Sequence, residues 1–169
     1  MEPVELRAAT GEAANFEAFF RAGYPTLFQA AYLLTSDRQE ADDIAQEAFL
    51  RAYERWDRVH AMDSPTGYVY RVALNLNRSR LRKVAVRARR VFAMVPDDDP
   101  AATVLASRQV LDALSQLPPG QREAIVLTEW LGLGSEEAGQ LLGIDASSVR
   151  GRLHRGRTAL RSLLGEVDE

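Results

Sequence analysis

The residues best suited to chemistry are the basic side chains in the last quarter of the chain. A short helix is predicted over 135–142, followed by the turn Gly143-Ile144-Asp145 and a second helix. No acidic residue interrupts the second helix before Glu166, and its basic residues are Arg150, Arg152, His154, Arg155, Arg157 and Arg161. Arginine binds phosphate and guanine through paired hydrogen bonds, and the second helix of such a layout enters the DNA major groove. The pattern therefore predicts contact with DNA.

A solvated arginine face on a surface helix is the alternative interpretation of this segment. Such a face ordinarily carries glutamates three or four residues from the arginines, and none occurs here. Asp145 is placed to cap the second helix, whose early turns reach base edges in proteins of this layout. We expect the apolar side of that helix to pack against the first helix through Val149, Leu153, Leu160, Leu163 and Leu164. On this balance DNA contact is favoured.

A second basic stripe lies between Arg78 and Arg90, where seven basic residues occur without an acid. Two tyrosines and two asparagines precede it: Tyr68, Tyr70, Asn75 and Asn77. Aromatic rings stack on unpaired bases, asparagine contacts base edges, and arginines follow the backbone, which suits single-stranded or melted DNA. Each aromatic residue taken singly is better explained as part of the core, because its spacing is helical.

A third group is acidic and lies opposite the apolar stripe of a helix predicted over 36–56. Its members are Asp42, Asp43, Gln46 and Glu47. Acids near a helix N-terminus stabilise the helix dipole, so a solvated face explains them. The pairs Asp42/Gln46 and Asp43/Glu47 are expected to gain nothing from one another, and a basic protein partner would explain that cost. The residues alone leave both interpretations open.

Nearly the whole chain is predicted to be helical, because apolar residues recur with a period near 3.6 and no sustained alternation occurs. We expect a break at Tyr24-Pro25, a capping box of Ser36 with Gln39, and a helix start at Ser64-Pro65. Further helices are predicted over 104–117 and 121–131. The fold class is therefore all-α, with two small helical domains over 12–92 and 104–165. A flexible acidic linker, 93–103, joins them, and the second domain contains the helix-turn-helix.

Composition limits the partners and the chemistry. The 169 residues carry a net charge of −3, so the positive charge is segregated and not in excess. DNA affinity comes largely from phosphate contacts, so we expect the protein to bind DNA weakly unless a partner protein also binds the DNA. The absence of cysteine and of a targeting segment favours the cytoplasm, and no apolar run predicts membrane insertion. No phosphate loop, metal-ligand spacing or nucleophile motif is present, so we predict no cofactor, no metal and no enzymatic activity.

Three segments in their order resemble the extracytoplasmic-function sigma factors, the minimal two-domain promoter-specificity subunits of bacterial RNA polymerase. They are EADDIAQEAFLRAYERW, SPTGYVYRVALNLNRSRLRK and LSQLPPGQREAIVLTEWLGLGSEEAGQLLGIDASSVRGRLHRGRTALR. The resemblance extends over about 16–164. It implies that the acidic helix docks on core RNA polymerase, with Asp43, Gln46 and Glu47 as contacts.

The same resemblance implies two contacts with promoter DNA. The loop 58–65 and the helix after it would capture a flipped base of the minus-ten element, with Asn75, Arg78 and Arg80 on that strand. The second helix of the helix-turn-helix would contact the minus-thirty-five duplex through Arg150, Gly151, His154 and Arg155. The linker would pass along the RNA-exit side of the polymerase. Control by a separate anti-sigma factor is also implied by the resemblance and by no residue of the chain.

Some positions depart from the family pattern. Gly151 and Ser148 stand where the family often has serine and threonine, so promoter preference is expected to differ. The melting loop carries His60 and Met62 without an aromatic residue, which leaves its base-gripping residue unidentified. The chain ends soon after Leu164, and we expect no additional regulatory domain there.

The sequence thus predicts a sigma factor that responds to a signal and directs RNA polymerase to a small set of promoters, melting DNA without ATP. The alternative is a stand-alone helix-turn-helix regulator that binds operator DNA as a dimer. A dimer needs a self-complementary apolar surface, and no surplus apolar helix is evident. A small helical enzyme ranks third.

Overall fold

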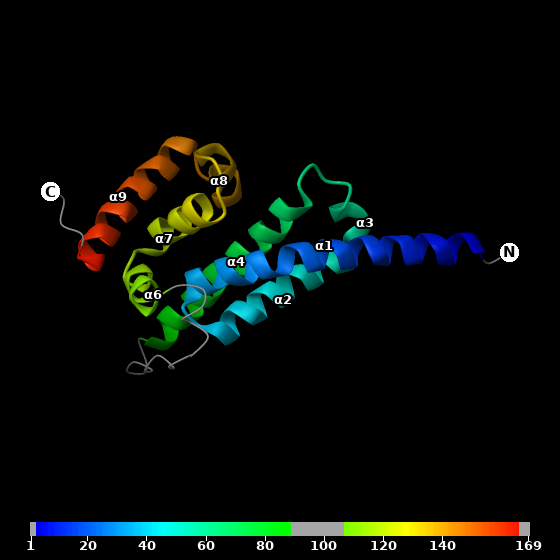
Figure 1. The fold of residues 1–169 in the computed structure, drawn as a ribbon, viewed down its shortest axis with the longest axis horizontal. Coiled ribbons are helices and arrows are strands. Elements are labelled where there is room, and N and C mark those ends of the chain that lie inside the picture. The colour runs from blue at the N-terminus through cyan, green and yellow to red at the C-terminus, as the bar shows by residue number, and fades with distance from the viewer. Residues whose placement is uncertain (1–2, 89–106, 166–169) are drawn as a thin grey trace.

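The described part of the protein is built from helices (Figure 1). The computed structural model describes residues 3–88 and 107–165, with side chains from 15 to 87 and from 107 to 165, and these ranges contain no strand. The first unit comprises α1 (Pro3–Thr35), α2 (Arg38–Glu54), α3 (Trp56–Val59) and α4 (Pro65–Ala88). The second comprises α6 (Arg108–Ser115), α7 (Pro119–Ile125), the π-helical turn η1 (Val126–Trp130), α8 (Ser135–Leu142) and α9 (Ala146–Leu164). The all-α prediction is confirmed, and the predicted linker lies outside the described residues.

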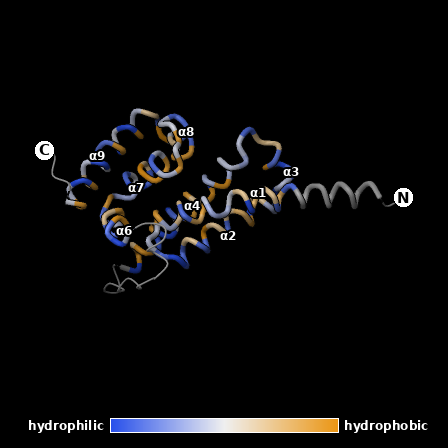
Figure 2. The backbone as a smooth tube through the Cα atoms, in the orientation of Figure 1, coloured by the Kyte–Doolittle hydropathy of each residue, from blue (hydrophilic) through white to orange (hydrophobic). Residues whose placement is uncertain are grey.

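The first unit is held together by one buried stripe of α2 and an aromatic cluster from α1. Four alanines on that stripe let α1 and α4 approach α2 closely, and Phe49 packs against aromatic rings of α1. The rings of Phe19 and Phe20 lie 5.5 and 5.2 Å from that of Phe49, in edge-on contact. Such aromatic pairs add to the apolar area that the helices bury. Along the helices, hydrophobic positions are interspersed with hydrophilic ones (Figure 2).

Helix α1 continues through Pro25, so the predicted break at Tyr24-Pro25 is wrong. A proline inside a helix loses one backbone hydrogen bond and costs about 3 kcal/mol or more. Residues on both sides of it, among them Phe20 and Leu27, pack into the core of the first unit. Burial of that continuous face offsets the local cost, while Pro25 itself is exposed.

The start of α2 is shifted by one residue from the prediction. Asp37 is the N-cap, and its Oδ1 accepts the backbone N–H of Glu40 at 2.9 Å. Ser36 instead adopts a positive φ of 54°, and the backbone changes direction there between α1 and α2. The helix also ends at Glu54, before the predicted end at 56. The predicted start of α4 is confirmed, since Ser64 Oγ accepts the N–H of Gly67 at 2.9 Å.

The described part of the second unit contains a π-helical turn. Ser107 caps α6, which starts at Arg108, and residues 104–106 of the predicted helix lie outside the described residues. The helix predicted over 121–131 starts earlier, at Pro119, and its second half is η1. The boundaries of α8 and the three-residue turn before α9 match the prediction.

The two units share one hydrophobic core. Helix α1 contacts α6 and η1, and α4 contacts α8, as Figure 1 shows. Leu127 of η1 and Leu27 of α1 are both almost fully buried and line the same small cavity between the units. Asn77 of α4 lines it too and is 2% exposed. The basic stripe of α4 therefore lies beside the second unit.

Candidate nucleic-acid interface

The turn between α8 and α9 is defined by two glycines and a capping aspartate. Gly143 ends α8 with a φ of 69°, a conformation that favours glycine. A side chain on Gly139 would meet the carbonyl oxygen of Ile144 at 2.6 Å, so only glycine allows this close approach. Asp145 accepts hydrogen bonds from the Ser147 hydroxyl and from Ser148, whose N–H lies 2.8 Å away. These bonds hold the pKa of Asp145 well below its usual range, and the predicted cap is confirmed.

Helix α9 buries one side and presents basic residues on the other. Val149 and Leu153 are buried, and Gly156 lets α7 approach so closely that a Cβ there would lie 2.7 Å from Ile125. Arg150, His154 and Arg155 are exposed, and Gly151 is half-buried beside them. Leu163 is 39% exposed, so the expectation that it packs in the apolar face is wrong.

Two further arginines of α9 contact other residues of the protein. Arg157 Nε lies 2.8 Å from Glu129 Oε1, and both side chains are about half exposed. The guanidinium of Arg152 lies against Gly120, where a Cβ would meet its Nη1 at 2.8 Å. In the described part of the chain no carboxylate pairs with Arg150 or Arg155. The predicted DNA-contacting residues of α9 thus lie together on a solvent-facing surface.

The candidate residues on α4 differ in how exposed they are to solvent. Asn75 is exposed, whereas Asn77 is buried and its Oδ1 accepts hydrogen bonds from the guanidinium of Arg80 at 3.3 and 3.4 Å. Arg80 is half-buried by this contact. Asn77 therefore belongs to the core, and its polar atom is satisfied internally. Arg82, Lys83 and Arg87 remain exposed along the same helix.

Arg78 contacts the second unit and is half-buried there. Its Nε and Nη2 donate to Glu123 Oε1 and Oε2 at 3.0 and 3.1 Å, a two-pronged ion pair across the contact between α4 and α7. The Glu123 side chain is 4% exposed and that of Arg78 is 34% exposed. The hydrogen bond to Glu123 raises the pKa of Arg78. The two residues are 45 positions apart, so no local pattern predicts the pair.

The acidic face of α2 contains hydrogen bonds that were not expected. Gln46 donates to Asp42 at 2.8 Å, and the expectation that this pair gains nothing is wrong, because an amide and a carboxylate four residues apart can bond. Asp43 accepts from Gln39 at 2.9 Å, and Glu47 pairs with Arg51 at 2.7 Å. These bonds satisfy the polar groups locally. Asp43 and Gln46 are nevertheless exposed, and Glu47 is half-buried.

Asp42 also fixes the position of α2 on α1. Its carboxylate accepts the hydroxyl of Tyr24, and burial together with this bond raises the pKa of Tyr24 to about 12. Tyr24 remains protonated across the physiological range, so it keeps donating to Asp42. The acidic face is thereby held in register with the aromatic cluster of α1.

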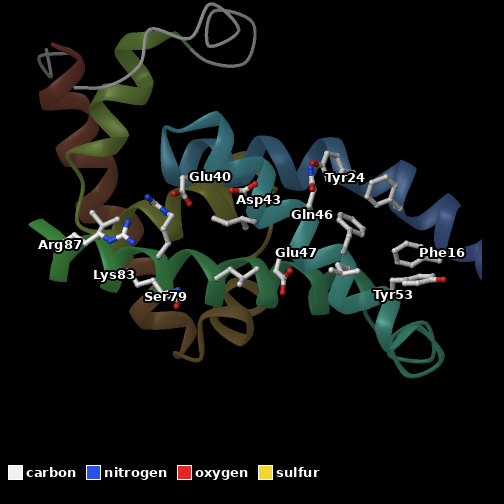
Figure 3. A pocket seen from close by; sticks show the side chains of 17 residues that line it. Phe16, Tyr24, Glu40, Asp43, Gln46, Glu47, Tyr53, Ser79, Lys83 and Arg87 are labelled. Atoms are coloured by element: carbon white, nitrogen blue, oxygen red, sulfur yellow. The ribbon is translucent and has the colours of Figure 1, made fainter. Parts of the chain in front are cut away.

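The acidic face forms one wall of a groove of about 1090 Å³ between α1, α2 and α4. Figure 3 shows Asp43, Gln46 and Glu47 on α2 along the groove, with Lys83 and Arg87 of α4 at one end. Aromatic side chains of α1 and α2 line the opposite end (Figure 3). The surface thus combines carboxylates, cations and apolar rings, and sequence reasoning missed the contribution of α1 and α4. Only the packing of the three helices brings these residues together, and no sequence pattern indicates it.

The predicted melting loop leads from α3 to α4 and faces solvent. His60 and Met62 are both exposed there, and His60 Nδ1 lies 3.0 Å from the carbonyl oxygen of Trp56. No group of three potential metal ligands occurs among the described residues. None of the helices in 3–88 and 107–165 combines the length and apolar character needed to cross a membrane.

Comparison with protein families matches two regions of the chain. Residues 19–87 match sigma-70 region 2, and residues 107–160 match sigma-70 region 4. The first match covers the second half of α1, all of α2 and α3, and most of α4, and the second covers α6 to most of α9. The solved structures of two sigma factors are similar in fold. RpoE of Bartonella quintana, in complex with the anti-sigma factor NepR, has a TM-score of 0.79 and 24% identity over 91% of this chain and 99% of that one. CnrH, in complex with the cytosolic domain of CnrY, has a TM-score of 0.69 and 27% identity over 96% of both chains.

Two curated relatives are similar along most of their length. The RNA polymerase sigma-E factor of Streptomyces avermitilis is 32% identical over 95% of this chain and 90% of its own. The ECF RNA polymerase sigma factor SigW of Bacillus subtilis is 31% identical over 83% of this chain and 84% of its own. The two matched regions occur in the predicted order, and they cover the helices that carry the basic and acidic surfaces. The relatives of matching length agree with this assignment. The chain belongs to the extracytoplasmic-function group of RNA polymerase sigma factors.

Proposed function

We propose that this sigma factor contacts the minus-thirty-five element of its promoters through the first half of α9. Arg150, Gly151, His154 and Arg155 form the contact surface. The observation that carries this proposal is the exposure of the three basic side chains beside a helix start capped by Asp145. Burial of Val149 and Leu153 fixes the helix, so these side chains reach outward from a rigid support.

The minus-ten strand is bound by α4 in this proposal. Asn75 is exposed, and Arg78 and Arg80 lie one turn farther along the helix. Arginines on one helix can follow successive phosphates of a melted strand, while the asparagine contacts a base. Melting relies on capture of the unpaired base and uses no nucleotide hydrolysis. The protein therefore acts by binding and not by catalysis.

Core RNA polymerase docks on the acidic face of α2. Asp43, Gln46 and Glu47 lie on one wall of the groove, which also offers aromatic area for a partner to bury. Carboxylates steer a basic partner and set its orientation, while the apolar rings supply affinity. The same surface is accessible to an anti-sigma factor, the kind of protein with which RpoE of Bartonella quintana was crystallised. We place the protein in the cytoplasm, where such a polymerase operates.

Run-off transcription tests the function directly. Purified core polymerase is combined with the protein and a pool of genomic fragments, and the transcripts are sequenced. We expect a small set of start sites that appear only when the protein is added. Transcription that is unchanged by the protein, over a range of protein concentrations, would contradict the proposal.

A further inference from the structure

The loop between α3 and α4 presents one polar ring to solvent, that of His60. Figure 1 shows this loop projecting from the first unit, and His60, Met62 and Asp63 are exposed in it. Met62 offers only a thioether sulfur, and the charge of Asp63 repels phosphates. The hydroxyl of Ser64 already caps α4. His60 is therefore the side chain of this loop best suited to bind a base by a hydrogen bond.

The imidazole of His60 is held in place by the end of α3. Its Nδ1 lies 3.0 Å from the carbonyl oxygen of Trp56, which also accepts the backbone N–H of His60 at 2.8 Å. Trp56 is 8% exposed, and the centroid of its ring lies 5.2 and 5.1 Å from those of Phe16 and Phe19. The Trp56 ring is 5.7 Å from the imidazole and supports one side of it. An exposed ring thereby has a fixed orientation.

The contact with Trp56 decides which nitrogen of His60 carries the hydrogen. A carbonyl oxygen can only accept, so Nδ1 is the donor and, in the neutral ring, Nε2 is an acceptor. Within residues 15–87 and 107–165 no hydrogen bond to Nε2 occurs. An acceptor bonds the amino group that adenine and cytosine carry at the position where guanine and thymine carry an oxygen. The loop thus presents a nitrogen that distinguishes these two pairs of bases.

We propose that His60 binds the captured base of the minus-ten element and selects adenine or cytosine there through Nε2. This inference rests on the proposed function, in which α4 binds the minus-ten strand. Arg71 and Asn75 are exposed one turn apart on α4, and that helix begins at Pro65, directly after the loop. A strand that follows these side chains toward the start of α4 reaches the loop. There the free side of the imidazole stacks on an unpaired base.

The test uses the holoenzyme formed with core polymerase and a promoter mapped by run-off transcription. Fluorescent single-stranded oligonucleotides carry the minus-ten segment of that promoter, and each position is varied in turn among the four bases. Fluorescence anisotropy at about pH 8, where histidine is ordinarily neutral, measures the affinity for each oligonucleotide. We expect one position at which adenine or cytosine binds about 2- to 10-fold more tightly than guanine or thymine, the range of a single hydrogen bond.

His60→Ala should abolish the preference at this position and leave the preferences at all other positions unchanged. His60→Lys should reverse it in favour of guanine or thymine, because an ammonium group only donates hydrogen bonds. Its added charge acts on every oligonucleotide through the phosphates, so the comparison between bases isolates the contact. A merely structural role of His60 in the loop would not produce this reversal.

Met62→Ala and Asp63→Asn are the matched controls, since they change neighbouring exposed side chains of the same loop. Both should keep the wild-type preference. Loss of the preference in either control, with His60→Ala unaffected, would assign the captured base to that residue and overturn the inference.

Two further results would also overturn the role of His60. One is a preference for guanine or thymine that disappears in His60→Ala, and the other is a set of preferences identical in His60→Ala and the wild type. A wild-type protein that directs no run-off transcription would defeat the proposed function and this inference with it. Transcription without a base preference that depends on His60 would defeat this inference alone.

Discussion

At the scale of single residues, the arginines differ in what surrounds them. Arg150 and Arg155 face solvent, Arg157 shares an exposed pair with Glu129, and Arg78 is bonded to a buried carboxylate. An exposed ion pair contributes about 0–1 kcal/mol, so Arg157 can leave its partner for a phosphate at little cost. Removing one partner of a mostly buried pair is far more costly because a charge is left without compensation. Identical side chains are therefore unequally available to DNA.

Replacement of Arg150 by alanine is predicted to relax sequence choice at one base pair of the minus-thirty-five element. Loss of a bidentate contact to guanine costs about 1–3 kcal/mol of discrimination. The measurement is transcription by the polymerase complex from promoters varied at each position. Arg161→Ala, about 16 Å farther along α9, is the control and should leave discrimination unchanged. An equal loss on every promoter would make Arg150 a phosphate contact only.

Asp145 predicts a pH-dependent contribution of one cap to stability. The pKa of Asp145 is lowered in the folded protein by bonds from Ser147 and Ser148, so the ionised group stabilises the fold. That contribution is complete above the unfolded value of 3.8 and is lost as the pH falls toward the lower folded value. Asparagine caps a helix without titrating. The melting temperature of Asp145→Asn should therefore fall less than that of the wild type when the pH is lowered from about 6 to about 3.

Asp63→Asn, in the exposed loop before α4, serves as the comparison for this measurement. It removes a carboxylate from a position that caps no helix. Its melting temperature should follow that of the wild type at each pH. The same reduced acid sensitivity in both variants would mean that the effect belongs to net charge and not to the cap.

At the scale of elements, packing decides which surface each helix presents. Helix α1 remains continuous through Pro25 because its aromatic face is buried on α2. That continuity lets Phe16 and Tyr24 line the same groove as the acidic residues of α2. The docking surface is therefore a product of three helices.

Reversal of charge on α2 is predicted to abolish binding of core polymerase. In Asp43→Arg with Glu47→Arg, two carboxylates of the groove wall become cations, which repel a basic partner. Both side chains reach solvent, and the lost pair of Glu47 with Arg51 contributes only about 0.2–0.5 kcal/mol. The fold should thus persist, as circular dichroism and a single melting transition would show, while co-purification with core polymerase disappears.

Glu17→Arg with Glu54→Arg is the control for this reversal, because it changes the net charge equally at exposed positions outside the groove. It should retain polymerase binding. Undiminished co-purification of the Asp43 and Glu47 variant would exclude these residues as the docking contacts. Loss in both variants would attribute the effect to overall charge.

At the scale of the whole molecule, a chain of net charge −3 carries exposed basic residues along α4 and α9 and an exposed acidic face on α2. We predict that the isolated protein binds promoter duplex poorly at about 150 mM salt, because few phosphates are neutralised and one arginine is occupied internally. Fluorescence anisotropy with and without core polymerase measures this difference. Tight and specific binding by the protein alone would instead favour a dimeric operator-binding regulator.

The elements that the sequence predicts correctly are those defined by neighbouring residues. The turn before α9, its cap at Asp145 and the start of α4 at Ser64-Pro65 each depend on a few consecutive positions. Wrong predictions occur where a distant contact changes the outcome, as at Ser36, whose hydroxyl bonds Arg122 and not the start of α2. Residue identities alone did not distinguish the buried Asn77 from the exposed Asn75 either.

The sequence by itself determined that the chain is helical, that a basic helix follows a short turn, and that acids and bases are segregated. These properties follow from local propensity, periodicity and charge, which require no partner. Only the tertiary structure decided that Arg78 binds Glu123, that Arg122 reaches α1, and that three helices form one groove. The physical reason is that each of these contacts joins residues far apart in the chain, and their meeting depends on how whole helices pack.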